Sequence, residues 1–126
     1  MSWQAYVENQ LIGTGFISKA IIAGHDGTLW AKSDNIEPTR EELVKLSPSF
    51  ADQDSLAMSG VYLGGEKFIY LSGNEKVIRC KKGKCGVHMM KTSQAVLVAL
   101  FEEPIQHPQV AGIVESLGEY LISLSF

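Results

Sequence analysis

The sequence predicts an α+β fold with a central antiparallel sheet of about six or seven strands. Residues 95–101 form an uninterrupted apolar run, which indicates a strand buried on both faces. Short Gly-rich and Asn-containing connections separate strand-length runs and favour antiparallel neighbours. Both ends of the chain have helical periodicity. We therefore expect the N- and C-terminal helices to share one face of the sheet, with short helices on the other and the two chain ends close together.

Helical signals mark both ends of the chain. The first helix is expected to begin at an N-cap, Ser2, and to end at Gly13. At about 100° per residue, one of its faces carries Trp3, Tyr6, Val7 and Gln10. The last helix has an apolar stripe of Val110, Ile113, Val114, Leu117, Leu121 and Leu124. Tyr120 lies at the edge of this stripe, where we expect it to be half exposed.

Strand signals dominate the middle of the chain. Residues 17–24 and 28–32 flank the turn His25-Asp26-Gly27 and predict a hairpin. A short helix is expected to open at residues 37–42, to bury Leu43, Val44 and Leu46, and to end at Pro48. A second helical piece is expected around residues 52–58. The remaining strand-length runs are residues 61–64, 67–72, 76–81, 86–91 and 94–101.

Length and composition favour one domain over residues 1–126. The chain is 45% hydrophobic, and no linker, repeat or low-complexity run divides it. No stretch approaches the roughly 18 apolar residues of a membrane span, and the opening residues do not resemble a signal peptide. We therefore expect a soluble, cytoplasmic protein. A net charge of −3 argues against a nucleic-acid-binding protein, which would normally be basic across one face.

Residues with catalytic or metal-binding chemistry are few and poorly spaced. His25, His88 and His107 have no spacing to Cys or carboxylate residues that would form a triad or a metal site. Cys80 and Cys85 bracket a hairpin turn, which could bring them opposite each other. A single pair is a weak zinc signal, and free thiols are favoured over a disulfide in a reducing compartment. The sequence predicts neither an enzyme nor a cofactor.

Aromatic residues near the two ends and in the second strand suggest a binding groove. A proline-rich ligand in the polyproline II conformation docks between aromatic ridges at low entropic cost. Two terminal helices side by side would offer such ridges, with a strand beneath them. The aromatic set is Trp3, Tyr6, Trp30, Tyr120 and Phe126. From the residues alone, packing of helix against sheet explains this set equally well.

Basic residues are concentrated in one stretch of the chain. The set is Lys76, Arg79, Lys81, Lys82, Lys84 and Lys91. Three interpretations remain open: a solvated hairpin, a surface for an acidic protein partner, and a surface for an anionic membrane leaflet.

Four motifs resemble the profilin family from one end of the chain to the other. They are Met-Ser-Trp-Gln-Ala-Tyr-Val at residues 1–7, Leu-Ile-Gly-Thr-Gly at 11–15, His-Asp-Gly-Thr-Leu-Trp-Ala at 25–31, and Val-Glu-Ser-Leu-Gly-Glu-Tyr-Leu-Ile at 114–122. The resemblance implies a profilin-like fold and a cytoskeletal adaptor that regulates actin nucleotide exchange and filament assembly. Its implied partners are monomeric actin, proline-rich proteins such as formins, and phosphoinositide membranes.

The resemblance also implies roles for individual residues. The five aromatic residues match profilin positions that bind poly-proline. The implied actin-binding residues are Lys81, Lys82, Lys91, Gln106 and Ser116. The implied phosphoinositide-binding residues are Lys76, Arg79, Lys81, Lys82 and Lys84.

Two segments depart from the pattern of many profilins. Residues 71–76 read Leu-Ser-Gly-Asn-Glu-Lys where relatives read Leu-Arg-Ala-Asp-Asp-Arg, and residues 106–108 read Gln-His-Pro where relatives read Gln-Pro-Gly. A lysine lacks the planar bidentate fork of arginine, so we expect weaker and more salt-sensitive actin binding. The alternative hypothesis is a small-ligand sensory domain of similar three-layer shape, against which the dense apolar residues of 94–101 argue.

Overall fold

A seven-stranded antiparallel sheet forms the centre of the computed structural model, which describes residues 2–126. The strand order is β2-β1-β7-β6-β5-β4-β3. The strands are β1 Lys19–Gly24, β2 Leu29–Lys32, β3 Val61–Leu63, β4 Glu66–Gly73, β5 Val77–Lys82, β6 Cys85–Lys91 and β7 Ala95–Glu102. Every predicted strand is present, and each neighbouring pair is antiparallel as expected.

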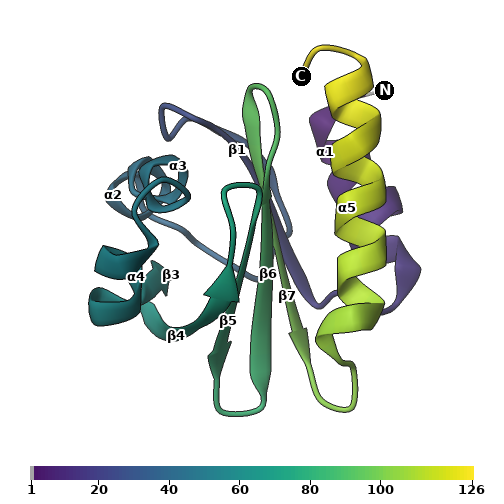
Figure 1. Ribbon diagram of the computed structural model, residues 1–126. Helices are drawn as coiled ribbons and strands as arrows, with labels where there is room; N and C mark the ends of the chain where they lie inside the picture. The colour runs from purple at the N-terminus through teal and green to yellow at the C-terminus, as the bar shows by residue number, and fades with distance from the viewer. Residues whose placement is uncertain (1) are drawn as a thin grey trace.

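The sheet separates two layers of helices (Figure 1). The terminal helices cover one face, and three short helices cover the other, which confirms the predicted α+β arrangement. Figure 1 also shows the two chain ends close together beside the last helix. None of the helices in residues 2–126 combines the length and the apolar character needed to cross a lipid bilayer.

The first helical segment changes its winding along its length. It comprises α1 Trp3–Ala5, the π-helix η1 Tyr6–Leu11 and the 3₁₀ turn η2 Ile12–Thr14. Ser2 is the N-cap, because its hydroxyl accepts from the Ala5 N–H at 3.1 Å. The predicted end at Gly13 is wrong: the left-handed residue that ends the segment is Gly15, with φ of 83°. Gly13 instead permits a close approach, because a Cβ there would lie 2.8 Å from the Glu8 carbonyl oxygen.

Three short helices cover the other face: α2 Arg40–Val44, α3 Leu46–Ser49 and α4 Gln53–Ser59. Thr39 begins α2 with a capping box, in which Thr39 and Glu42 bond each other's main-chain N–H groups. Pro48 was predicted to end the short helix that opens at residues 37–42, but α2 already ends at Val44. Pro48 lies in the first turn of α3, where a proline costs no helical hydrogen bond. Val44 was expected to be buried but is 42% exposed, because the chain turns at Lys45 into α3.

The last helix, α5 His107–Ser123, packs against β6 and β7. Its buried residues are Val110, Val114, Leu117, Gly118 and Leu121. Tyr120 is 52% exposed, as its place at the edge of the stripe predicted. Leu124 departs from the expected stripe and is 46% exposed, because α5 ends at Ser123 and the chain then turns back.

The central strand β7 explains the apolar run in the sequence. Its residues 95–101 are all buried, with alternate side chains entering opposite layers. Leu97 and Phe101 pack under the terminal helices, whereas Val96 and Val98 pack under the short helices. Such a strand has no solvent-facing side, so its sequence does not alternate.

Candidate functional site

Trp3 is the centre of an aromatic cluster at the junction of α1, β2 and the C-terminal residues. Its ring centroid lies 4.7 Å from that of Trp30, 5.6 Å from that of Tyr6 and 5.2 Å from that of Phe126, which it meets edge to face. These spacings are those of favourable aromatic pairs. Trp30 lies close over Gly24, where an added Cβ would come 3.0 Å from the indole nitrogen. The rings therefore support one another through direct packing.

Phe126 is held in the cluster by main-chain hydrogen bonds. The Thr92 hydroxyl donates to the Phe126 carbonyl oxygen at 2.7 Å, and the Gln94 N–H donates to the same oxygen. The Phe126 N–H donates to the Leu121 carbonyl at 2.8 Å. These contacts fold the last residues over the β6–β7 turn and bring Phe126 to Trp3.

Tyr6 and Tyr120 continue the aromatic surface away from Trp3. Both rings line a groove of about 510 Å³ between the first helical segment and α5, which we call the helix groove. Its lining residues are Tyr6, Gln10, Thr14, Ile113, Ser116, Leu117 and Tyr120. Loss of solvent and then the neighbouring Tyr120 raise the pKa of Tyr6, so its hydroxyl remains a proton donor at neutral pH. The five predicted aromatic residues thus form one continuous surface.

The basic residues, in contrast, divide between the two faces of the sheet. On β5, Val77 belongs to the core under the terminal helices, whereas Cys80 belongs to the core under the short helices. Because side chains alternate along a strand, Arg79 and Lys81 lie on the terminal-helix side and Lys82 lies on the other. The Lys82 ammonium group is 3.5 Å from the Glu66 carboxylate, and both side chains are about half exposed.

Basic residues also occupy opposite ends of the strands. Lys81 pairs with Gly86, and Lys91 lies five positions further along β6, about 17 Å at the rise of a strand. Lys91 is a neighbour of Lys76 rather than of Lys81, because the Lys91 N–H donates to the Lys76 carbonyl at 2.8 Å. Lys81, Lys82 and Lys84 therefore form one group at the β5–β6 turn, the hairpin lysines. Lys76 and Lys91 form a second group at the far end.

Gln106 and Ser116, the two predicted actin-binding residues at the last helix, lie apart from each other. Gln106 is the N-cap of α5, and the nearby Glu103 N–H donates to the Lys84 carbonyl at 3.0 Å. This bond brings the start of α5 to the hairpin lysines. Ser116 lines the helix groove with Tyr6. The structure thus brings Gln106 toward Lys81 but brings neither Ser116 nor Lys91 there.

Exposed apolar side chains next to Lys81 were not singled out from the sequence. Ile69 pairs with Lys81 across β4 and β5 and is 64% exposed. Leu71 is 49% exposed, at a point where the β4 register shifts between Tyr70 and Ser72. The signal was available in β4, where Ile69 and Leu71 alternate with the inward-facing Phe68 and Tyr70. An outward-facing apolar pair beside basic residues is typical of a protein interface.

His88 is buried beneath this face. Its Nε2 lies 3.2 Å from the Glu115 carboxylate of α5, and its Nδ1 has no hydrogen-bond partner among the described residues. Burial, with the charges of Arg79 and His107, lowers the pKa of His88 to about 4. These effects outweigh the opposing attraction of Glu115, so His88 is neutral at pH 7 and its Nε2–H donates to the carboxylate.

The cysteines remain free thiols. Cys80 pairs with Val87 and Cys85 pairs with Lys82, so the register does not bring the cysteines opposite each other, as their spacing had suggested. Burial raises the pKa of Cys80 to about 12, which makes it unreactive at neutral pH. Within residues 2–126, no three His, Cys, Asp or Glu side chains are grouped to hold a metal ion.

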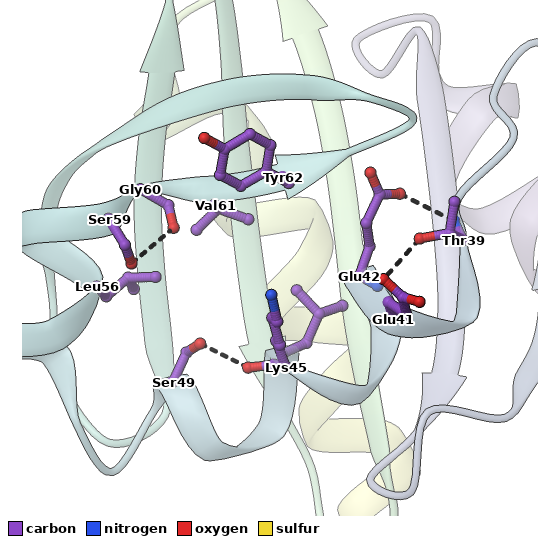
Figure 2. A pocket seen from close by; sticks show the side chains of 11 residues that line it. Thr39, Glu41, Glu42, Lys45, Ser49, Leu56, Ser59, Gly60, Val61 and Tyr62 are labelled. Atoms are coloured by element: carbon purple, nitrogen blue, oxygen red, sulfur yellow. Dashed lines mark hydrogen bonds between the residues drawn. The ribbon is translucent and has the colours of Figure 1, made fainter.

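A second pocket, of about 360 Å³, lies between the short helices and β3 (Figure 2). Its polar side chains mostly serve the local fold. The Glu42 carboxylate accepts from the Thr39 and Gly64 N–H groups, and the Ser49 and Ser59 hydroxyls donate to helix carbonyls. Partial burial opposes ionisation of Glu42, but these N–H bonds outweigh it and lower the pKa. We assign this pocket a structural role.

Comparisons with known proteins agree with this arrangement. A sequence profile of the profilin family matches residues 1–126. The chain is 52% identical to a profilin of Drosophila melanogaster and 50% identical to one of Bombyx mori, each over 126 residues and 100% of both chains. The crystal structure of Acanthamoeba castellanii profilin II has a TM-score of 0.94 at 36% identity, covering 99% of this chain and 100% of that one.

A more distant structure shares the fold. Mouse profilin IIa, solved in complex with a double repeat from the FH1 domain of mDia1, has a TM-score of 0.83 at 19% identity, with 100% of both chains covered. The family profile matches the whole chain, and each of the two insect relatives is about half identical to it over its full length. These matches argue against the alternative hypothesis of a small-ligand sensory domain. The chain belongs to the profilin family.

Proposed function

We propose that this profilin is an adaptor with two binding surfaces, one for an actin monomer and one for a proline-rich segment. The basic face, for actin, comprises Arg79, Lys81 and Gln106 with the exposed Ile69 and Leu71, and the aromatic face, for proline, comprises Trp3, Tyr6, Trp30, Tyr120 and Phe126. Profilins are actin-binding proteins without enzymatic activity. Binding would loosen the nucleotide cleft of actin and speed nucleotide exchange, which is a shift in the partner's conformational equilibrium. We place this activity in the cytoplasm, at the actin cytoskeleton, in a single domain spanning residues 1–126.

The aromatic cluster around Trp3 is the observation that carries the proline half of this proposal. Trp3 lies within 5.6 Å of three other aromatic rings, measured between ring centroids. Rings that are already fixed pay little entropy on binding, and a polyproline II ligand is itself already extended. The solved complex of mouse profilin IIa with FH1 repeats supports a formin segment as the partner.

The actin half rests on a smaller set of residues than the sequence suggested. We assign it to Lys81, Arg79 and Gln106, together with the exposed Ile69 and Leu71. Apolar side chains supply contact area, and basic side chains steer an acidic partner into place. Lys82 lies across the sheet and is a secondary candidate. We leave out Lys91, which lies about 17 Å along the strand from Lys81, and Ser116, which lines the helix groove.

Phosphoinositide binding would use the hairpin lysines, Lys81, Lys82 and Lys84. All three are exposed at one turn, next to Arg79. Clustered basic residues near an anionic leaflet contribute about 1 kcal/mol each. Lys76 lies at the far end of β5 and would not join the same lipid headgroup. Because this attraction is electrostatic, it should weaken steeply as salt concentration rises.

Simultaneous binding tests the adaptor directly. The wild type is saturated with a proline decamer and then titrated with monomeric actin. Because the two faces share no residue, we expect the actin affinity to stay within about twofold of its value without peptide. Displacement of actin by saturating peptide would show that the two ligands compete, which contradicts the assignment of two binding surfaces.

A further inference from the structure

We propose that the aromatic site extends into the helix groove, which would hold about three uncharged residues flanking the proline core of a ligand. This inference rests on the proposed proline binding at Trp3. It adds a second segment of ligand, recognised by apolar contact and by hydrogen bonds rather than by ring stacking.

Continuity of the surface is the first reason. Tyr6 and Tyr120 belong both to the aromatic set and to the lining of the helix groove, so a ligand leaving the cluster enters the groove directly. Beyond Tyr120, the groove continues along α5 back to Ile113. Seven residues of α-helix span about 10 Å, which is the length of about three residues in the polyproline II conformation.

Chemistry of the lining is the second reason. Leu117 is only 6% exposed, and with the half-buried Ile113 it provides an apolar floor. The exposed Gln10 amide and Ser116 hydroxyl have no hydrogen-bond partner among the described residues and stand available to a ligand. The Thr14 hydroxyl, by contrast, already donates to the Leu11 carbonyl at 2.7 Å. An extended peptide leaves its own N–H and carbonyl groups free, which suits both Gln10 and Ser116.

The absence of charged lining residues makes the groove selective for uncharged flanking residues. None of the seven lining residues carries a charge at neutral pH, so the groove offers no partner to a charged side chain and would desolvate it partly. A small apolar or uncharged flank therefore fits better than an acidic or basic one. Partners would then be distinguished by the residues beside their proline run, although all of them share the proline core.

Peptides with a defined register test the extension. We would compare hexaproline with hexaproline carrying Val-Leu-Val, Gly-Ser-Gly or Asp-Asp-Asp at either end, using isothermal titration calorimetry. Both ends are needed because the ligand could run in either direction. We expect Val-Leu-Val at one end to tighten binding about fivefold relative to Gly-Ser-Gly, because part of two apolar side chains is buried. Asp-Asp-Asp at that end should weaken it.

Variants locate the effect. The double variant Gln10→Ala with Ser116→Ala removes the hydrogen bonds that the main chain of any flank would make, so it should bind both Val-Leu-Val and Gly-Ser-Gly peptides more weakly than the wild type does, while keeping the affinity for bare hexaproline. Glu8→Ala is the matched control, because Glu8 lies on the same helical segment but lines a different hollow. The Glu8→Ala variant should bind every peptide with the affinity of the wild type.

Two failures have different meanings. If hexaproline binds but none of the three flanks changes its affinity, or if the double variant binds the uncharged flanked peptides as tightly as the wild type does, the extension is wrong and the aromatic site stands. If the wild type does not bind hexaproline at all, the aromatic assignment is wrong and the extension fails with it.

Discussion

The aromatic face and the basic face of this profilin differ in how their residues are brought together. Five aromatic residues from α1, η1, β2, α5 and the last residue form one continuous surface. Six basic residues from one stretch of sequence divide between two ends and two sides of the sheet. Basic residues that are close in the sequence therefore lie apart in the structure, whereas aromatic residues that are far apart in the sequence lie together.

Packing explains the difference. Aromatic rings lose contact with water when they meet, so the folding of the terminal helices itself drives them together. Exposed lysines gain little from each other and follow the register and the alternation of their strand. The aromatic face should therefore behave as a rigid, salt-insensitive site, and the basic face as an electrostatic one.

Removal of Trp3 should have the largest effect on either face. Trp3→Ala deletes the ring that contacts Trp30, Tyr6 and Phe126, so we expect a loss of proline-decamer affinity of at least about 30-fold. The ring is only half-buried, and the variant should remain folded and bind actin normally. Intrinsic fluorescence of the remaining Trp30, or calorimetry, measures the affinity.

Tyr62→Ala is the control for that experiment. Tyr62 is an exposed aromatic residue on β3, far along the sheet from Trp3. It should leave proline binding unchanged. A folded Trp3→Ala variant with wild-type affinity would contradict the assignment of the aromatic face.

His88 predicts a pH-dependent stability beneath the basic face. Its folded pKa of about 4 lies below the ordinary value of 6.5 because of burial, Arg79 and His107, with Glu115 opposing. A group with a lowered pKa stabilises the fold above its unfolded pKa, and this contribution is lost as the pH falls from 6.5 toward 4. Between pH 7.5 and 4.5 the loss should be about 2–3 kcal/mol.

Urea unfolding at both pH values, for the wild type and for His88→Leu, isolates this contribution. The variant cannot protonate at this position, so its free energy of unfolding should fall less than that of the wild type as the pH drops. An equal fall in both proteins would show that His88 is not held neutral.

The fold was largely predictable from the sequence, and the reasons lie in particular residues. The apolar run of 95–101, the glycine turns and the Ser2 cap each determine structure locally, and all agree with the result. The errors lie where tertiary contacts override a local signal. Gly13 looked like a helix end but serves close packing on Glu8, and Pro48 opens a helix rather than ending one.

The two faces were predictable to different degrees. The aromatic set was identified from the residues themselves, the match to profilin motifs added its binding role, and the structure brings all five together. The sequence alone could not show which basic residues share one surface, because the side of the sheet that a lysine faces depends on strand register. Ile69 and Leu71 were missed because an exposed apolar residue in a strand resembles a buried one in sequence.

Charge reversal at the two ends of the basic stretch sharpens the comparison. Lys81→Glu should weaken actin binding about tenfold, since Lys81 lies beside Ile69 on the proposed face. Lys91→Glu should change it by less than about twofold, because Lys91 lies about 17 Å away on the strand. This order departs from the actin role that the resemblance gave to Lys91. Equal losses in the two folded variants, measured by actin titration at fixed salt, would contradict it.

The smallest effect concerns how the aromatic face is held. The Thr92 hydroxyl donates to the Phe126 carbonyl at 2.7 Å and accepts from the Ala95 N–H at 3.0 Å. Thr92→Val keeps the shape of the side chain but removes both bonds, so Phe126 should leave its place beside Trp3 for part of the time. We expect proline affinity to fall about threefold and the free energy of unfolding to fall by about 1–2 kcal/mol.

Thr39→Val separates the two consequences of Thr92→Val. Thr39 caps α2 on the opposite face of the sheet, and its loss should cost about 1 kcal/mol of stability without touching the aromatic rings. If stability alone governed ligand affinity, both variants would bind proline equally. We expect only Thr92→Val to bind more weakly, because its complete binding surface is populated for less of the time. Equal affinities in the two variants would mean that Phe126 keeps its position without Thr92.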